Sequence, residues 1–219
     1  MPFGPDVILF DLDGTVIHSE AGIHVSLRAA LAPLGIDPTD DELAGFMGPP
    51  LAQVLEQLYG ITDPADIQLF SQGFQGSYFH AAEYEFEVYP GLPALLEELH
   101  AAGVTLALAT AKPHESATRI IDRAGLGHLF AFVAGSENDN SRQDKAEVIE
   151  HALAGIGADD RTHRVVMVGD RDLDIRAARS LGIDGVAVTW GYGTRDELSD
   201  CGAIGLADDA HALRALLLA

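Results

Sequence analysis

The sequence predicts an α/β fold, in which a parallel-sheet core carries an inserted all-helical domain. Residues 7–10 read V-I-L-F, an unbroken apolar run that is typical of a strand buried on both faces. From about residue 90 onward, short apolar runs alternate with segments of helical periodicity, which is the pattern of a parallel sheet with helical crossovers. Between these two parts, residues 17–85 show helical periodicity throughout.

The first strand ends at two carboxylates, Asp11 and Asp13, which are followed by Gly14 and Thr15. Ligands of open α/β sheets bind outside the carboxyl ends of the strands, so these side chains stand where such a sheet does its chemistry. Two like charges this close are costly to bury unless a cation or a proton compensates them. The alternative interpretation is a strand end followed by an ordinary D-G turn.

The segment after Thr15 predicts about four helices. An apolar stripe at a spacing of three to four residues opens it, and short helices are expected at 40–46 and 51–59 and a longer one at 63–82. The stripe is formed by Ile23, Leu27, Ala30, Leu31 and Leu34. We therefore assign residues 17–85 to an inserted helical domain, and residues 1–16 and 86–219 to the α/β core.

The rest of the core alternates between the two kinds of element. Helices are expected at 92–102, 115–124, 144–153, 175–181 and 210–218. Strands are expected at 104–110, 130–134, 165–168 and 185–189, with a weak last strand at 203–207. Such an alternation predicts a Rossmann-like parallel sheet with right-handed crossovers.

Composition excludes several classes of function. The formal net charge is −21, which opposes binding to nucleic acid or to an anionic membrane. No apolar run approaches the roughly 18 residues of a membrane span, and no signal region opens the chain, so we expect a cytoplasmic protein. The single cysteine excludes an internal disulfide, and no H-x-x-x-H pair predicts a zinc site.

Polar residues recur at the ends of the predicted strands and at the start of one helix. In order along the chain they are Asp11, Asp13, Thr110, Lys145, Asp170 and Asp174. Each is a weak signal alone, but together they resemble the four motifs of the haloacid dehalogenase-like (HAD) hydrolase superfamily. The resemblance spans nearly the whole chain and implies the HAD fold.

The resemblance implies roles for these residues in phosphoryl transfer, which requires a nucleophile, a proton donor and neutralisation of charge. Asp11 would be the nucleophile that forms an aspartyl-phosphate. Asp13 would protonate the leaving oxygen and then activate water. Thr110 would hydrogen-bond a phosphate oxygen, and Lys145 would neutralise Asp11 and the phosphate. Because the 2-haloacid dehalogenases lack the second aspartate, Asp13 favours a phosphatase.

The resemblance also implies Mg²⁺ as cofactor, since that ion prefers hard oxygen ligands. The metal site would comprise Asp11, the backbone carbonyl of Asp13 and Asp170, with Asp174 acting through water or from behind the ligands. The phosphate- and substrate-binding residues would be Leu12, Asp13, Thr110, Ala111, Lys112 and Lys145, together with Arg28, Gly48 and Pro49 of the insert. Lys112 would either approach the phosphate or be solvated beside Pro113.

Further features resemble the phosphoglycolate phosphatase-like branch of the superfamily, which includes 5′-nucleotidases. They are Gly48-Pro49-Pro50-Leu51, the segment 110–113, Ser141-Arg142 before Lys145, and Gly191-Tyr192-Gly193. The insert would then be a C1-type cap. Its Gly48-Pro49 segment would be either a loop that faces the substrate or a rigid turn between helices.

The insert holds ten acidic residues against one basic residue, Arg28, which disfavours a large polyanionic substrate. We therefore expect a small phosphorylated metabolite, such as phosphoglycolate or a 5′-nucleotide. Arg28 would either bind a second anionic group of the substrate or complete a solvated ladder with Glu20 and His24 at i,i+4 spacing.

Two other functions remain open at this point. A phosphomutase of the β-phosphoglucomutase kind shares the four motifs and would pass the phosphoryl group to a sugar hydroxyl instead of water. A protein on the same scaffold could also bind its ligand without turning it over.

Overall fold

A computed structural model describes residues 4–46, 51–80, 84–137, 142, 144–158 and 163–218, with the side chains of residues 79 and 80 left out. The chain divides into two compact units. One, the core unit, joins Met1–His18 to Val88–Ala219, and the other, the helical unit, is Ser19–Glu87. Each boundary lies two residues beyond the one that the sequence suggests. Among the described residues, no helix is both long and apolar enough to cross a membrane.

The core unit contains the predicted parallel sheet, which confirms the α/β fold class. Its six strands are arranged in the order β5-β4-β1-β6-β7-β8, and every neighbouring pair is parallel. The strands are β1 (Val7–Phe10), β4 (Thr105–Pro113), β5 (Phe130–Ser136), β6 (Val165–Gly169), β7 (Asp184–Val188) and β8 (Gly205–Ala207).

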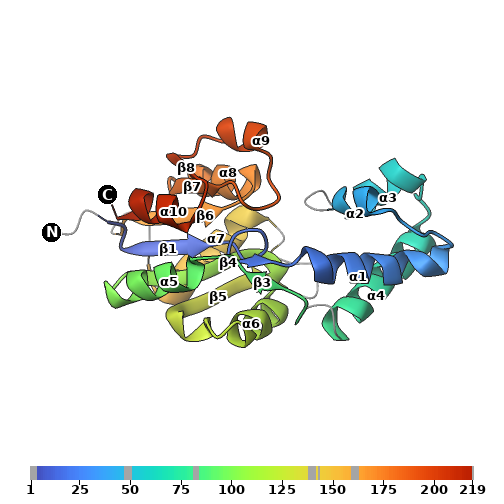
Figure 1. The fold of residues 1–219 in the computed structure, drawn as a ribbon, viewed down its shortest axis with the longest axis horizontal. Coiled ribbons are helices and arrows are strands. Elements are labelled where there is room, and N and C mark those ends of the chain that lie inside the picture. The colour runs from blue at the N-terminus through green and yellow to red at the C-terminus, as the bar shows by residue number, and fades with distance from the viewer. Residues whose placement is uncertain are drawn as a thin grey trace. The chain divides into compact units, whose positions relative to one another are not determined.

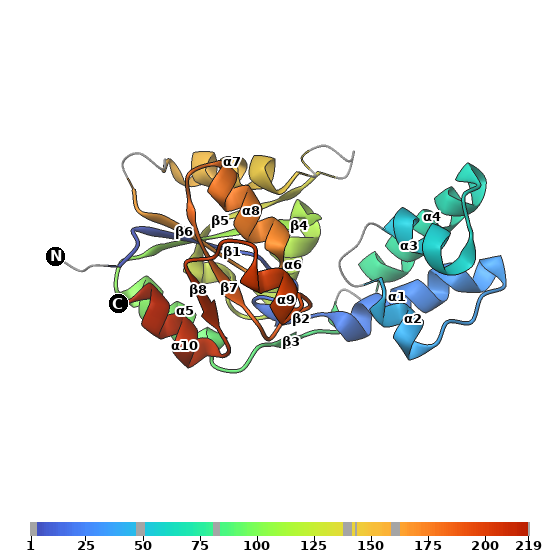
Figure 2. The ribbon, with the colours of Figure 1, turned by 90° about the horizontal axis from the view of Figure 1, so that it is seen from above.

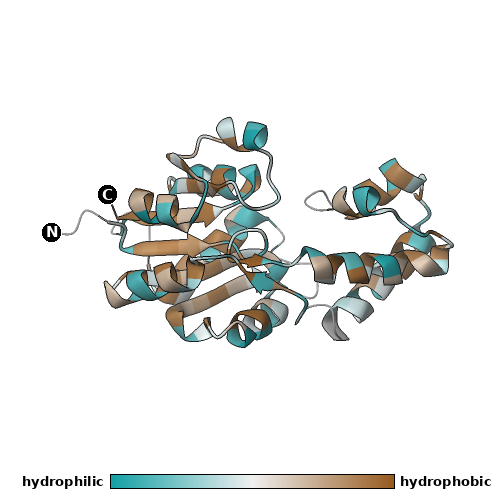
Figure 3. Ribbon diagram, in the orientation of Figure 1, coloured by the Kyte–Doolittle hydropathy of each residue, from teal (hydrophilic) through white to brown (hydrophobic). Residues whose placement is uncertain are grey.

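Helices cover both faces of the sheet (Figure 1). Helices α7 (Lys145–Ile156) and α8 (Asp172–Ser180) lie on one face, while α5 (Leu92–Ala101) and α10 (Ala210–Leu217) lie on the other (Figure 2). Two further helices, α6 (His114–Arg123) and the short α9 (Arg195–Ser199), follow β4 and β7 along the chain. Burial on both faces explains why the central strands are continuously hydrophobic (Figure 3).

The register of the three central strands brings their carboxyl ends to one edge. Phe10, the last residue of β1, pairs with Leu108 of β4 on one side and with Val168 of β6 on the other. The residues that follow these pairs therefore emerge together: Asp11, Thr110 and Asp170. Because β1 is flanked by strands from later in the chain on both sides, this edge is where open α/β sheets bind ligands.

The prediction of an all-helical segment over residues 17–85 is wrong at its start. Strands β2 (Ile17–His18) and β3 (Glu87–Val88) pair as a two-stranded sheet where the chain leaves the core and returns to it. Strands of two residues are too short to produce an alternating pattern, so the sequence shows no sign of them.

Two element boundaries differ in ways that matter for function. Strand β4 runs to Pro113 instead of ending at Thr110, and after a shift in register Pro113 pairs with Ser136 of β5. Helix α8 begins at Asp172, three residues before Ile175, because its first turn carries two aspartates and an exposed Leu173 and so adds nothing to the apolar stripe. Asp174 therefore lies within a helix.

The helical unit consists of α1 (Glu20–Leu31), the 3₁₀ helix η1 (Ala32–Leu34), α2 (Asp40–Ala44), α3 (Leu51–Tyr59) and α4 (Pro64–His80). Its buried residues form a core of their own. Phe70 is fully buried there, and its ring stacks between Phe46 and Phe74 at centroid distances of 6.1 and 6.3 Å. Gly48 and Pro49 lie outside the described residues.

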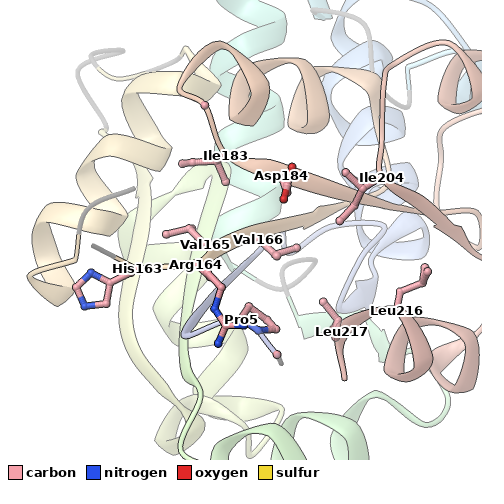
Figure 4. A pocket seen from close by; sticks show the side chains of 12 residues that line it. Pro5, His163, Arg164, Val165, Val166, Ile183, Asp184, Ile204, Leu216 and Leu217 are labelled. Carbon is pink, nitrogen blue, oxygen red and sulfur yellow. The ribbon is translucent and has the colours of Figure 1, made fainter. Parts of the chain in front are cut away.

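A cavity of about 330 Å³ lies at the opposite end of the sheet, where β6 and β7 begin (Figure 4). Ile183, Asp184, Ile204 and Leu217 are among the residues that line it. The strands run away from this cavity toward the carboxylates, so it is separate from the edge at which the candidate site residues gather.

The packing around Phe70 allows a test of the core of the helical unit. Replacing Phe70 by Ala removes a fully buried ring, so the free energy of unfolding should fall by about 3–5 kcal/mol. Its neighbour Leu69 has an exposed fraction of 43%, and Leu69→Ala should cost less than about 1 kcal/mol. Urea denaturation followed by circular dichroism measures both, and equal losses would contradict this packing.

Candidate active site

Asp11 is buried at the end of β1 and is held by a lysine. The Nζ atom of Lys145 lies 2.6 Å from Oδ1 of Asp11 and also 2.6 Å from Oδ1 of Asp174. Lys145 is the first residue of α7, where the carboxylate of Asp144 caps the helix by accepting a hydrogen bond from the backbone N–H of Ala146. The start of α7 therefore places the ammonium group between two carboxylates, one at the end of β1 and one in the first turn of α8.

Asp170 follows β6 and is fully buried. Its Oδ1 accepts a hydrogen bond from the hydroxyl of Thr15 at 3.2 Å, and its Oδ2 accepts one from the backbone N–H of Tyr192 at 2.7 Å. Gly14 has a φ of +80°, and a Cβ atom there would lie 2.2 Å from Oδ2 of Asp170. The close approach of these loops thus requires glycine at position 14.

The three buried carboxylates form one cluster. Asp11, Asp170 and Asp174 each offer an oxygen, and these oxygens lie within 4.8 Å of one another. Burial, opposed by Lys145 and reinforced by Asp174, raises the pKa of Asp11 to about 6. Burial followed by the charges of Asp11 and Asp174 raises the pKa of Asp170 to about 8. Burial lowers the pKa of Lys145, but the two carboxylates beside it outweigh that effect and raise it.

The donor set of this cluster suits a divalent hard cation. Three carboxylates and one ammonium group leave two negative charges uncompensated when all are ionised. Carboxylate oxygens are the ligands that Mg²⁺ and Ca²⁺ take in proteins. Asp174 has both oxygens engaged already, since Oδ1 faces Lys145 and Oδ2 accepts a hydrogen bond from the backbone N–H of Arg171 at 3.1 Å. Asp11 and Asp170 are therefore the better candidates for direct ligation.

A second ion pair lies beside the first. Nζ of Lys112 is 3.1 Å from Oδ2 of Asp13, and the side chain of Lys112 is only 8% exposed. The extension of β4 beyond Thr110 holds Lys112 in place, because its backbone N–H donates to Oγ1 of Thr110 and the hydroxyl of Ser136 donates to the carbonyl of Ala111. The alternative of a solvated Lys112 is therefore wrong.

The remaining residues predicted to bind substrate differ in their placement. Thr110 is buried in β4, two residues beyond the last pair of β4 with β1. The side chain of Leu12 is fully buried, so this position could offer a ligand only its backbone. Ala111 is exposed.

Arg28 binds within its own unit. Its guanidinium donates to the carbonyl of Pro38 at 2.7 Å and to Oδ1 of Asp40 at 2.5 Å, and so ties α1 to the start of α2 and the segment before it. His24 and Glu20 lie 3.6 Å apart at i,i+4 spacing, but Arg28 does not continue that ladder and pairs with Asp40 instead.

The loop that follows β7 contributes contacts that the sequence does not indicate. The indole N–H of Trp190 donates to the carbonyl of Thr15 at 3.1 Å, and the backbone of Tyr192 binds Asp170. Each contact involves a backbone group, which side-chain patterns do not report. The strand before the loop, β7, ends without a charged residue, so it gives no sign of a site. The available signals were the Gly191-Tyr192-Gly193 segment and the position of the loop directly after a strand of the parallel sheet, and neither indicates which groups these residues bind.

The chain is similar to known proteins over most of its length. A family model described as haloacid dehalogenase-like hydrolase matches residues 8–188. A haloacid dehalogenase-like family hydrolase from Streptococcus pneumoniae has a solved structure that superimposes with a TM-score of 0.87 at 29% identity, covering 97% of this chain and 98% of that one.

The similar curated proteins carry different names. Tyrosine-protein kinase PtkA of Mycobacterium tuberculosis is 37% identical over 193 residues, which are 88% of this chain, and the match spans 65% of the kinase's length. A 5′-nucleotidase of Pseudomonas aeruginosa is 36% identical over 96% of this chain and 94% of its own length. A phosphoglycolate phosphatase of Agrobacterium fabrum is 31% identical over 87% and 83%.

The raised pKa of Asp170 predicts how the stability of the metal-free protein depends on pH. Its pKa is 3.8 in the unfolded chain and about 8 in the folded protein, so the stability that this group contributes is lost as the pH rises through about 8. Asp170→Asn removes this dependence, so the melting temperature of the variant should exceed that of the wild type by a growing margin from pH 5 to pH 9.

Thermal scans in excess EDTA measure this margin. Asp184→Asn removes the same charge at an exposed position of the core unit and serves as the matched control. A constant difference between Asp170→Asn and wild type across that pH range would contradict the prediction.

Proposed function

This chain belongs to the haloacid dehalogenase-like hydrolase family, and we propose that it is a Mg²⁺-dependent phosphomonoester hydrolase that acts through an aspartyl-phosphate. One observation carries the proposal most directly: Asp11 stands buried at the end of the central strand, 2.6 Å from Lys145 and in a cluster with Asp170 and Asp174. A carboxylate held beside a fixed cation and a buried acidic cluster has the surroundings that a nucleophile toward phosphate needs.

In the first step, a carboxylate oxygen of Asp11 attacks phosphorus and forms a P–O bond, while the bond from phosphorus to the ester oxygen breaks. Protonated Asp13 gives its proton to the departing alcohol oxygen. Lys145 balances the negative charge of Asp11 and of the phosphoryl group, which allows the two anions to approach each other. The hydroxyl of Thr110 donates a hydrogen bond to a phosphoryl oxygen.

In the second step, water attacks the phosphorus of the aspartyl-phosphate. Asp13, now ionised, takes a proton from this water, and the P–O bond to Asp11 breaks. Inorganic phosphate leaves, Asp11 is again a carboxylate, and Asp13 is again protonated. The cycle therefore consumes one water for each ester that is cleaved.

The metal site would use Asp11, the backbone carbonyl of Asp13 and Asp170, with Asp174 holding Lys145 in place. When bound, Mg²⁺ supplies positive charge that neutralises the phosphoryl oxygens. The acidic cluster supports this assignment, because a divalent cation would compensate the two charges that Lys145 leaves unbalanced.

We propose a small phosphate ester, phosphoglycolate or a 5′-nucleotide, as substrate, and we propose that the helical unit with its Gly48-Pro49 segment acts as a cap over the site. The names of two relatives, a 5′-nucleotidase and a phosphoglycolate phosphatase, support this substrate class. The excess of acidic over basic residues in the helical unit also disfavours larger polyanions. We further propose that the protein works in the cytoplasm.

A specific observation favours one second candidate. The similarity to a protein named tyrosine-protein kinase suggests transfer of a phosphoryl group to a tyrosine hydroxyl instead of water. A mutase would likewise pass it to a sugar hydroxyl. Incubation with labelled ATP and a tyrosine peptide, with a sugar phosphate and a bisphosphate, and with a panel of small esters separates the three by product.

The nucleophile is tested by Asp11→Asn, which keeps the shape of the side chain but removes its charge. Release of phosphate from p-nitrophenyl phosphate should fall at least about a thousandfold, while the circular dichroism spectrum stays that of the wild type. Asp184→Asn should keep full activity. Addition of excess EDTA should abolish turnover by the wild type, and restored Mg²⁺ should recover it. Turnover by Asp11→Asn at the wild-type rate would refute the mechanism.

Arg28 tests the choice of substrate. Because its guanidinium is already bound to Pro38 and Asp40, we expect Arg28→Gln to change KM for phosphoglycolate, a nucleotide and an uncharged-tail ester by similar small factors. If Arg28 instead binds the carboxylate of phosphoglycolate, KM for that substrate alone should rise more than about tenfold, because a charged hydrogen bond contributes about 1.5–3 kcal/mol. Steady-state kinetics on the three substrates decides between these outcomes.

A further inference from the structure

The loop after β7 touches the acidic cluster through a chain of two hydrogen bonds. The indole N–H of Trp190 donates to the carbonyl oxygen of Thr15 at 3.1 Å. The hydroxyl of the same Thr15, which is fully buried, donates to Oδ1 of Asp170 at 3.2 Å. Trp190 therefore anchors Thr15, and Thr15 in turn binds one oxygen of Asp170, the proposed metal ligand.

The same loop binds the other oxygen of Asp170 directly. Oδ2 accepts a hydrogen bond from the backbone N–H of Tyr192 at 2.7 Å. A Cβ atom on Gly191 would lie 2.3 Å from the carbonyl oxygen of Gly14 and 2.4 Å from Oδ2 of Asp170, so the loop and the segment after β1 are in close contact. Both oxygens of Asp170 are thus oriented by groups that the Trp190–Tyr192 loop supplies or anchors.

We propose that Trp190 is a positioning residue: acting through Thr15, it fixes the orientation of the Asp170 carboxylate and with it the affinity of the site for Mg²⁺. The inference rests on the proposed function, since it takes the acidic cluster to be the metal site. It adds a residue outside that cluster, in the loop after β7, that controls metal affinity.

Coordination chemistry explains why orientation matters here. Mg²⁺ demands a nearly ideal octahedron of oxygens, whereas Ca²⁺ accepts a looser and more variable geometry. Groups that hydrogen-bond a metal ligand from behind commonly change metal affinity by 10- to 100-fold when removed. A carboxylate that is free to rotate should therefore lose Mg²⁺ more than it loses Ca²⁺.

The indole ring also packs against other aromatic rings, and this packing can be separated by mutation from the hydrogen bond to Thr15. The ring of Trp190 lies 6.1 Å from that of Tyr89, which in turn lies 5.8 Å from His18, and His18 lies 6.1 Å from Tyr192. These aromatic residues gather where the chain passes between the core and helical units. Trp190→Phe keeps an aromatic ring in this group but removes the N–H donor to Thr15.

The experiment measures binding of Mg²⁺ and of Ca²⁺ by isothermal titration calorimetry in five proteins prepared without metal: wild type, Trp190→Phe, Thr15→Val, the double variant of these two, and Tyr89→Phe. Tyr89→Phe is the matched control, because it keeps its ring and alters the aromatic group without touching Thr15 or Asp170. Trp190 is the only tryptophan of the chain, so its fluorescence reports metal binding independently in every variant that retains it. Melting temperatures without metal show that each variant is folded.

We expect Trp190→Phe and Thr15→Val each to raise the dissociation constant for Mg²⁺ about tenfold and that for Ca²⁺ by a smaller factor. In the Thr15→Val background, Trp190→Phe should have little further effect, because the link to Asp170 is already cut. Tyr89→Phe should bind both ions like the wild type.

Three results would overturn the inference, and they distinguish its failure from that of the proposed metal site. Unchanged Mg²⁺ binding by Trp190→Phe, or effects of the two substitutions that multiply in the double variant, would show that Trp190 does not act through Thr15, while the proposed metal site would stand. A wild-type protein that binds neither ion would remove the metal site of the proposed function and the inference together.

Discussion

The site depends on the burial of three carboxylates around the ammonium group of Lys145. Burial of like charges is expensive, and here it raises the pKa values of both Asp11 and Asp170. The fold offsets this cost by placing a positive charge among the carboxylates. The register of β4, β1 and β6 brings the strand ends to one edge, and the start of α7 places the ammonium group of Lys145 there. Backbone N–H groups of Arg171 and Tyr192 bind one oxygen each of Asp174 and Asp170, and the hydroxyl of Thr15 binds the other oxygen of Asp170.

The distribution of cations in the sequence follows the same constraint. The chain contains two lysines against eleven arginines, and both lysines lie in this site, paired with Asp13 and Asp11. Several of the arginines form pairs at the surface, such as Arg195 with Asp208 and Arg214 with Glu98. A compact ammonium group with rotatable donors can shift between a carboxylate and a phosphoryl oxygen, whereas the planar fork of arginine favours one fixed partner. The few lysines are therefore placed where a partner must change during the proposed reaction.

Much of this could be predicted from the sequence, because the strong signals are local. The apolar run of β1, the alternation of strands and helices and the polar residues at strand ends depend on neighbours in the chain, and they identified the sheet, its functional edge and the residues that gather there. The features that could not be predicted depend on backbone contacts between segments that are far apart in the sequence. Strands β2 and β3 are too short to show a period, and the burial of Lys112 follows from a shifted pairing of Pro113 with Ser136. The bond from Trp190 to a carbonyl has no counterpart in side-chain patterns.

The charges of the site link the binding of a cation to the binding of the substrate. Four carboxylates, those of Asp11, Asp13, Asp170 and Asp174, face two lysines, so the site would carry two uncompensated negative charges if all of these groups were ionised. A phosphate ester brings further negative charge and would be repelled. A divalent cation would offset that repulsion and leave the positive charge of Lys112 and Lys145 available to an incoming phosphoryl group. Cation and substrate would therefore favour each other's binding, and the groups that orient the ligands of the cation would influence both.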